Sequence, residues 1–340
     1  MVVAMDEKLI LLGHGSGGLL SHELIEKVFL RHLGNALLTP LEDSALFESA
    51  ERLLAFTTDS YVVKPIFFPG GDIGRLAVCG TVNDLSMRGA RPLHLSAGFI
   101  IEEGLPIDDL ETIVASMHAA ADEAGVTIVC GDTKVVEKHA ADKLFINTSG
   151  VGAVPKNVSV SVSNAQPGDS VIVSGTVGDH GVTILSQRQG LQFKSLTKSD
   201  VAPLNGLVQE MLAACPGIHA MRDPTRGGLA TTLNEIAKSS KVGIEIEEDS
   251  IPVSDAVERA CEMLGLDSLY LANEGKLVVL VAKEQTEHLL EVMRNHVYGR
   301  AAAVIGQVTS ERPGRVVMRN PFGIRRTIEI LASDQFPRIC

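Results

Sequence analysis

The chain contains 340 residues, of which 45% are hydrophobic and 4% aromatic, with no tryptophan, and its formal net charge is −12 at pH 7. The hydrophobic share excludes a wholly disordered protein, and the negative charge disfavours nucleic acid and anionic membrane surfaces as partners. The scarcity of aromatic side chains also disfavours stacking platforms for single-stranded nucleic acid.

The first half of the chain predicts alternating strands and helices. A helix is expected over 75–87, where apolar residues recur at helical spacing, and Gly89 follows its C-terminus. A second helix is expected to open at Asp108, with Glu111 completing a capping box, and to end at Gly125. Apolar runs predict strands, of which the third is of the buried type. The predicted strands are 53–58, 93–101, 126–130 and 144–154.

A polar, turn-forming stretch at 155–169 is the best candidate for a domain boundary. We therefore expect an N-terminal domain at 1–155 and a C-terminal domain at 166–332. A short tail at 333–340 then carries Cys340.

The second half continues the α/β pattern. A helix is expected directly after Asp223, with Pro224 in its first turn and with Leu229, Leu233 and Ile236 on one face. Apolar runs predict strands at 170–174, 277–282 and 302–308.

The cysteines and the apolar runs bear on the compartment. No run approaches the ~20 apolar residues of a membrane span, and no signal peptide is evident at the N-terminus. The five cysteines form no C-x-x-C pair, which disfavours a disulfide framework or a zinc ribbon, and Cys79 and Cys130 are expected to be packed thiols. A reducing cytoplasm fits these features best.

Four aspartates stand out because of their positions. Asp59 and Asp132 each follow a predicted strand, Asp43 lies in a Glu-Asp-Ser turn, and Asp84 lies inside a predicted helix. Carboxylates that converge at one sheet edge repel unless a hard cation neutralises them, and Mg²⁺ prefers oxygen ligands together with substrate phosphates. The alternative is ordinary turn chemistry, in which aspartate caps and turns the chain. Asp84 is the hardest of the four to explain in that way.

Two glycine-rich segments could bind anions through backbone N–H groups. The segment 13–18 includes Gly15, Gly17 and Gly18, but it lacks the lysine of a P-loop, and a flexible N-terminal arm is the alternative. Arg226-Gly227-Gly228 precedes a predicted helix, where a phosphate or another oxyanion could bind. Its alternative is a tight strand–helix turn.

The sequence ends in Pro-Arg-Ile-Cys. A thiol on a short arm could visit more than one site, and Arg338 is a candidate contact for a partner. The alternative is an incidental cysteine, although exposed thiols are usually avoided.

The motifs that occur along the chain are Gly-His-Gly-Ser-Gly-Gly at 13–18, Asn-Asp-Leu-Ser-Met-Arg-Gly-Ala-Arg-Pro at 83–92, Cys-Gly-Asp-Thr-Lys at 130–134, Asp-Pro-Thr-Arg-Gly-Gly at 223–228, Asn-Glu-Gly-Lys at 273–276 and Pro-Arg-Ile-Cys at 337–340. In this order they resemble the HypE family, the carbamoyl-cysteine dehydratases of nickel–iron hydrogenase maturation. The acidic motifs alone indicate only the wider aminoimidazole ribonucleotide synthetase superfamily, which includes selenophosphate synthetase and thiamine-phosphate kinase. The final Pro-Arg-Ile-Cys narrows the assignment.

The resemblance implies a two-domain α/β (α+β) fold of the aminoimidazole ribonucleotide synthetase type, in which the N-terminal sheets of a homodimer pair into a barrel. It implies ATP and Mg²⁺ as cofactors. A carbamoyltransferase partner would load Cys340, and ATP-dependent dehydration would convert the thiocarbamate to a thiocyanate. An iron-scaffold maturation complex would then receive the cyanide.

The resemblance also implies roles for individual residues. Cys340 would carry the reacting group, Glu274 would be the base, and Lys134 would stabilise the phosphoryl group or act with Glu274. The remaining positions would bind Mg²⁺ or the nucleotide and the second reactant's oxyanion. They are Asp43, Asp59, Asp84 and Asp132 for the metal and triphosphate, Asn83, Gly15, Gly17 and Gly18 for the nucleotide pocket, and Thr225, Arg226, Gly227 and Gly228 for the oxyanion.

Two other functions fit parts of the sequence. Another synthetase or kinase of the same superfamily would act on a free small molecule and would not need Cys340. A non-catalytic carrier would need Cys340 but would have no use for ATP or for four aspartates.

Overall fold

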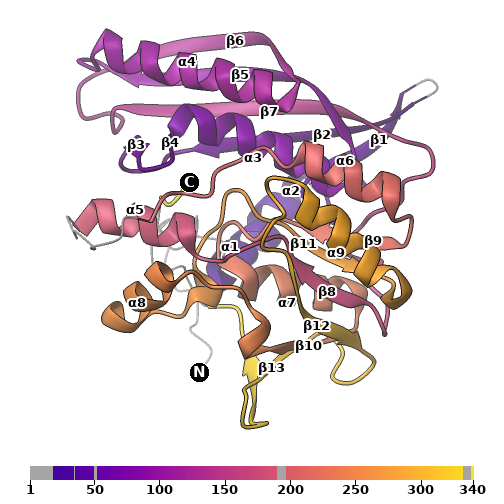
Figure 1. Ribbon diagram of the computed structural model, residues 1–340. Coiled ribbons are helices and arrows are strands. Elements are labelled where there is room, and N and C mark those ends of the chain that lie inside the picture. Colours follow the sequence, from indigo (N-terminus) through magenta and orange to yellow (C-terminus); the bar gives the residue numbers. More distant parts are fainter. Residues whose placement is uncertain (1–17, 34, 50–51, 190–196, 332–337) are drawn as a thin grey trace.

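The computed structural model describes residues 18–33, 35–49, 52–189, 197–331 and 338–340. Each half of the chain forms one large sheet with its own helices, and the two halves stack with helix α3 of the first half facing the second (Figure 1). Among the described residues, no helix is both long and apolar enough to span a membrane.

The first sheet has the strand order β1-β2-β7-β5-β6. Neighbouring strands in this sheet are antiparallel except for β5 and β6, which run parallel. Strand β6 is last in the order and forms one edge of the sheet. The strands are β1 (Ala45–Ser49), β2 (Arg52–Tyr61), β5 (Arg91–Glu102), β6 (Thr127–Val136) and β7 (Leu144–Val154), and a short hairpin joins β3 (Phe67–Phe68) to β4 (Gly71–Asp72).

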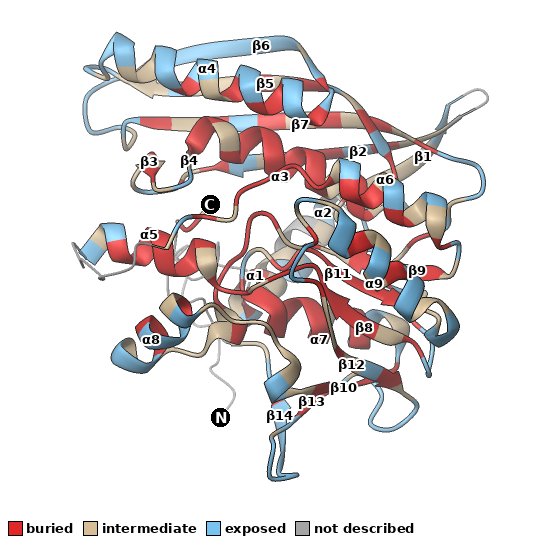
Figure 2. Cartoon of the chain, in the orientation of Figure 1, coloured by how far each residue is buried: buried red, intermediate tan, exposed pale blue. Residues whose placement is uncertain are grey.

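Helices α3 (Ile73–Met87) and α4 (Ile107–Ala124) cover one face of this sheet. The Asp72 carboxylate caps α3 by accepting hydrogen bonds from the N–H groups of residues 74 and 75. Gly74 permits close contact between the helices, because a Cβ there would lie 2.4 Å from the Ile113 carbonyl oxygen. As a result α3 is almost wholly buried, as Figure 2 shows.

The strand and helix predictions for the first half are largely confirmed, including the helix end at Gly125, which adopts the left-handed conformation. The prediction that a capping box at Asp108 opens this helix was wrong. Helix α4 begins at Ile107, its N-cap Pro106 makes no side-chain cap hydrogen bond, and Asp108 lies in the first turn. The strand containing Asp59 runs on to Tyr61, so this residue lies within β2 rather than after it.

Strand β6 also differs from its prediction. It extends to Val136, so Asp132 lies within the strand, and most of its side chains are exposed rather than buried (Figure 2). Val129 and Val135 are 58% and 66% exposed, and Cys130 is an exposed thiol instead of a packed one. Cys79, in contrast, is buried as predicted.

The second sheet has the strand order β14-β13-β10-β12-β8-β11-β9. It is antiparallel except for the parallel pair β10 and β13. The strands predicted in this half are confirmed. The full set is β8 (Ser170–Val173), β9 (Ile218–Arg222), β10 (Gly243–Glu247), β11 (Val278–Val281), β12 (Ala303–Thr309), β13 (Val316–Arg319) and β14 (Arg325–Ile328).

The helices of the second half pack around this sheet. In α7 the predicted apolar face is confirmed, since Leu229, Leu233 and Ile236 are buried, but the helix begins at Gly228, so Pro224 lies outside it. Two short helices, α1 (Leu19–Leu24) and α2 (Leu30–Leu33), precede β1. The others are α5 (Asp179–Gln189), α6 (Asn205–Ala214), α7 (Gly228–Ser240), α8 (Asp255–Leu264) and α9 (Thr286–Asn295).

Candidate active site

A cavity of about 540 Å³ lies between β2 and α3 of the first half and α7 of the second. Its lining contains seven of the fifteen candidate site residues that the sequence singled out. Those brought together here are Asp43, Asp59, Asp84, Thr225, Arg226, Glu274 and Cys340.

Hydrogen bonds from Thr57 link two of the cavity aspartates, Asp43 and Asp84, to strand β2. Thr57 Oγ1 on β2 lies 2.9 Å from the carbonyl oxygen of Asp43 and also 2.9 Å from Oδ2 of Asp84. Because Thr57 and Asp59 are two positions apart in the strand, both side chains lie on the same face of the sheet. The turn before β1, the strand β2 and the helix α3 thus converge on one point.

Burial, together with the neighbouring negative charges, disfavours the ionisation of Asp43, Asp84 and Asp223 in this cavity. Burial, reinforced by the charges of Asp223 and Asp59, raises the pKa of Asp84 well above its usual value. Burial also raises the pKa of Asp223 to about 8, and the negative charge of Asp43 adds to this rise. Burial raises the pKa of Asp43 to about 6. A cation bound among these groups would relieve both the repulsion and the desolvation.

The donor chemistry fits Mg²⁺, which takes carboxylate oxygens. Asp43 Oδ2 and Glu274 Oε1 are buried and have no hydrogen-bond partner in the described chain. Each oxygen can therefore bind a metal ion or accept a hydrogen bond from a ligand. No three described His, Cys, Asp or Glu side chains already converge closely enough to hold one ion. A metal bound here would therefore draw part of its shell from water or from the bound nucleotide.

Two arginines that line the cavity, the half-buried Arg222 and the more exposed Arg226, balance part of this negative charge. Arg222 Nε lies 3.3 Å from Oδ1 of Asp43 and 3.1 Å from Oε2 of Glu235. The pKa of Arg226 is raised first by the negative charge at Cys340 and also by Asp59 and Glu274. Arg226 therefore stays charged beside the reactive end of the chain.

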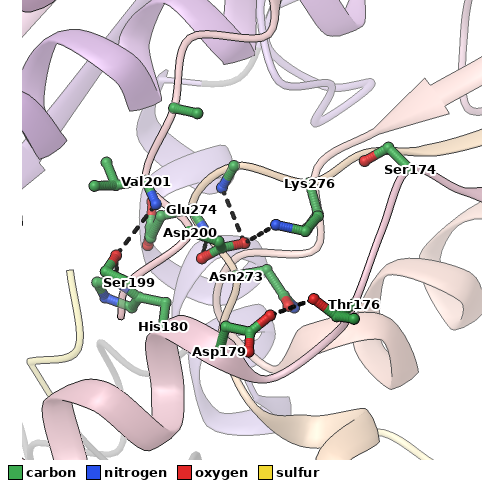
Figure 3. Close-up of polar contacts among 12 residues, drawn as sticks. Ser174, Thr176, Asp179, His180, Ser199, Asp200, Val201, Asn273, Glu274 and Lys276 are labelled. Atoms are coloured by element: carbon green, nitrogen blue, oxygen red, sulfur yellow. Dashed lines mark hydrogen bonds and ion pairs between the residues drawn. The ribbon is translucent and has the colours of Figure 1, made fainter. Parts of the chain in front are cut away.

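The loop that carries Glu274 is fixed by a buried ion pair, shown in Figure 3. The Asp200 carboxylate accepts the backbone N–H groups of Glu274 at 3.1 Å and Gly275 at 3.3 Å, and it lies 2.9 Å from Nζ of Lys276. Asn273 adds a further anchor, since its Oδ1 accepts the N–H of Gly178 at 2.8 Å. Burial, followed by the charges of Asp200 and Asp223, raises the pKa of Glu274 well above its usual value.

Cys340 reaches the cavity because the segment 338–340 is docked between the two halves. The N–H of Val62 donates to the main-chain oxygen of Cys340 at 3.0 Å, and Ile339 is 3% exposed within the core cluster of the first half. Arg338 donates to the Val62 carbonyl at 2.9 Å and pairs with Asp142 at 2.8 Å.

Other predicted residues lie elsewhere in the single chain. Asp132 and Lys134 do not line the cavity; they form an ion pair 2.6 Å long on β6, with 73% and 67% of their side chains exposed. The amide of Asn83 is buried, and its Oδ1 accepts the N–H of Leu204 at 2.7 Å.

The predicted glycines have separate positions. Gly227 and Gly228 form the start of α7 with φ of 75° and 61°. Gly18 precedes α1 and is buried, whereas Gly15 and Gly17 lie outside the described residues.

Sequence reasoning missed Arg222, Asp223 and Glu235 as parts of the cavity. Asp223 stands at the head of the motif Asp-Pro-Thr-Arg-Gly-Gly, and this position was the only signal for it. The pairing of Arg222 with Asp43 spans the two halves of the chain, so no local pattern could have indicated it.

Comparisons with known proteins agree with this arrangement. The AIR synthase related protein N-terminal domain matches residues 41–154, and the corresponding C-terminal domain matches 166–319. The chain is 54% identical to the carbamoyl dehydratase HypE of Azotobacter vinelandii over 327 residues, which cover 96% of each protein.

Solved structures extend the similarity to three dimensions. The crystal structure of a HypE–HypF complex matches with a TM-score of 0.87 and 52% identity, covering 91% of this chain and 99% of that chain. A HypE structure in complex with ATP matches with a TM-score of 0.83 and 53% identity, covering 98% and 100%. These matches confirm the family and the two-domain α/β fold predicted from the motifs, and the chain belongs to the HypE family of carbamoyl dehydratases.

Proposed function

We propose that this protein uses ATP to dehydrate an S-carbamoyl group on its own Cys340, forming a thiocyanate that supplies cyanide to the iron of nickel–iron hydrogenase. Membership of the family makes the protein a carbamoyl dehydratase of hydrogenase maturation. The observation that carries the self-modifying step is the shared cavity, which holds Cys340, the buried Glu274 and the three aspartates Asp43, Asp59 and Asp84.

The chemistry requires a leaving group and a base. The oxygen of a thiocarbamate leaves poorly, because it would depart as hydroxide. When bound, ATP supplies a γ-phosphoryl group that turns this oxygen into part of a phosphate leaving group. As the C–O bond breaks, the amide nitrogen gives up both protons and its bond to carbon becomes a nitrile. The atoms lost equal one water, so no oxidant or reductant is needed.

Glu274 is the residue that we assign as general base. Glu274 is 3% exposed, and its Oε1 has no hydrogen-bond partner in the described chain. Burial raises the pKa of Glu274, which makes its carboxylate a stronger base than an ordinary one, and positive charge bound among the neighbouring aspartates would favour the ionised form. Proton transfer is most effective when the pKa of the base lies near the working pH.

Asp43, Asp59 and Asp84 are the residues that would hold Mg²⁺, and the metal would screen the charge of the triphosphate. Thr225 and Arg226 line the same cavity and are assigned to the oxyanion of the second reactant, with Gly227 and Gly228 in the turn behind them. Gly15, Gly17, Gly18 and Asn83 remain our candidates for the wall of the nucleotide pocket.

We propose a homodimer that pairs along β6. This strand is an edge, ten residues long, and it exposes Val129 and Val135, a combination that favours pairing with another strand. A barrel formed from two such sheets would bury Asp132 and Lys134 at the interface. Each chain would then contribute these two residues to a site shared with its partner.

Two protein partners follow from the chemistry. HypF, the partner in the related complex, is proposed as the carbamoyltransferase that loads Cys340, and an iron-scaffold maturation complex would receive the cyanide. Because the docked Cys340 lies inside a cavity, the segment 338–340 must leave that cavity for both encounters. A free thiol is needed at each reloading, so we expect the reaction to take place in the reducing cytoplasm.

Intact mass spectrometry of carbamoyl-loaded protein tests the proposal. Adding Mg-ATP should remove ~18 Da, the mass of the water lost on phosphoryl activation of the amide. Glu274→Gln should bind ATP normally and slow this loss ~10²–10⁴-fold, the usual contribution of a general base. An undiminished thiocyanate yield in that variant would remove Glu274 from the mechanism.

The same assay separates the other two functions. A kinase or synthetase acting on a free small molecule would hydrolyse ATP equally well in a Cys340→Ser variant. A carrier without catalysis would keep its carbamoyl mass unchanged in the presence of Mg-ATP.

A further inference from the structure

We propose that His180 is a positioning residue of the dehydration reaction, and that it holds Cys340 in the cavity by binding the backbone of the preceding residue. This inference rests on the proposed function, because it assumes that Cys340 carries the reacting group. It assigns a role to a buried histidine and to Ser199, neither of which lines the cavity itself.

The geometry around the His180 ring defines its protonation. Nε2 lies 2.8 Å from the carbonyl oxygen of Ile339, and Nδ1 lies 2.8 Å from Oγ of Ser199. A carbonyl oxygen only accepts, so Nε2 must carry a proton. In the neutral ring Nδ1 then accepts from the Ser199 hydroxyl. The ring is fully buried, and burial lowers the pKa of His180, which favours this neutral form.

Ser199 is itself held in place, so it can orient the ring. Its Oγ accepts the N–H of Val201 at 3.2 Å, and its own N–H donates to the carbonyl of Pro69 at 2.8 Å. Gly70 allows this close approach: it has φ of 96°, and a Cβ there would lie 2.7 Å from the main-chain oxygen of Ser199. The Phe68 ring lies perpendicular to the His180 ring, with the two centroids 5.5 Å apart.

The same short segment also positions the proposed base. Asp200 follows Ser199 directly, and its carboxylate accepts the N–H groups of Glu274 and Gly275 (Figure 3). Ser199 therefore fixes the arm that carries the sulfur through His180, while Asp200 fixes the loop that carries the carboxylate. Such coupling matters because a misplacement of about 1 Å between reacting groups can cost ~10²-fold in rate.

Three variants of the full-length protein test this role. His180→Leu removes the donor to Ile339, whereas His180→Gln keeps a donor near the position of Nε2. Ser199→Ala removes only the group that sets the ring. The control is His288→Leu, at an exposed position on α9. Single-turnover loss of ~18 Da from carbamoyl-loaded protein gives the rate of the chemical step, and calorimetric titration gives the affinity for ATP.

We expect His180→Leu to slow the single turnover ~10²-fold and Ser199→Ala to slow it less, with unchanged ATP affinity. His180→Gln should recover most of the rate. Docking is followed separately by trypsin cleavage of the Arg338–Ile339 bond, which should accelerate about tenfold in His180→Leu, since a buried hydrogen bond has been lost.

The outcomes separate this inference from the proposed function. Wild-type protein that loses no water would overturn the proposed function itself. Wild-type turnover with equal rates and equal trypsin cleavage in His180→Leu or Ser199→Ala would overturn only the positioning role. A rate loss that His180→Gln does not recover would also count against it, because the donor would then be irrelevant.

Discussion

The Asp200 carboxylate and the Lys276 ammonium form an ion pair 2.9 Å long that is almost sealed from water, with 5% and 12% of the two side chains exposed. The ammonium, together with the bonds from the Glu274 loop, holds the pKa of Asp200 below its usual range despite the opposing effect of burial. This permanent negative charge anchors the loop that carries Glu274.

Replacing Lys276 with Met should destabilise the protein by about 3–5 kcal/mol, because it leaves the Asp200 charge buried and uncompensated. Urea unfolding measures the change. Arg259→Met is the matched control, since Arg259 pairs with Asp255 on the surface at 3.8 Å with 60% and 87% of the two side chains exposed. We expect less than about 1 kcal/mol for the control. Equal losses in the two variants would contradict the importance of the buried pair.

The stability of the protein without nucleotide should fall as the pH rises from 7 to 8.5. Asp223 has its pKa raised to about 8 from 3.8, so at pH 7 the folded chain holds a proton that the unfolded chain has already lost, and the folded chain loses it as the pH rises through about 8. The stabilisation that comes from a raised pKa is complete below the pKa of the unfolded state. It is lost as the pH rises through the pKa of the folded state. Thermal unfolding in a chelating buffer measures the slope.

Two additions test the cause of this slope. Asp223→Asn should flatten it, and Mg-ATP should raise the melting temperature most at pH 8.5, where the carboxylates are most ionised. A melting temperature that rises between pH 7 and 8.5 without nucleotide would show that these carboxyl groups are not protonated as described.

Gly275→Ala should disable the site. A Cβ at this position would lie 1.9 Å from the main-chain oxygen of Asp200, and since a backbone atom cannot swing away, the loop with Glu274 must shift. We expect at least ~10²-fold slower dehydration. Gly206→Ala is the control, because its Cβ would meet only the His296 ring at 3.4 Å. Comparable single-turnover rates in both variants would refute the effect.

The exposed thiol of Cys130 reports on the proposed dimer. In a Cys340→Ser background it is the readily accessible cysteine, because Cys79, Cys215 and Cys261 are buried. Pairing along β6 should protect Cys130 from alkylation increasingly as the protein concentration rises. Val135→Glu should restore alkylation and shift sedimentation to the monomer. A wild-type protein that sediments as a monomer at all concentrations would exclude this interface.

Local sequence patterns predicted the elements whose environment is uniform. Strand β7 and helix α3 matched to within two residues, because their apolar residues repeat regularly and Gly89 follows the end of α3. Strand β6 was misread because an apolar run does not reveal what covers it: Val129 and Val135 face solvent in the single chain.

The site was predictable only in part for a similar reason. Asp43, Asp59 and Asp84 were expected to converge, since several carboxylates that come together suggest a shared cation. The bond from His180 to Ile339 joins residues 159 positions apart, and it depends on a main-chain oxygen that every residue has. No residue type or spacing could have indicated such a contact.

The main-chain oxygens of the docked segment 338–340 accept three hydrogen bonds. The donors are Lys64 N–H to Arg338, His180 Nε2 to Ile339, and Val62 N–H to Cys340. These three bonds do not involve the sulfur, so they can form whether it is a bare thiol, a thiocarbamate or a thiocyanate. The main-chain bonds therefore do not by themselves expel the product. Under the proposed function, release would depend on capture of the arm by the protein that accepts cyanide, and without that acceptor the product would stay docked.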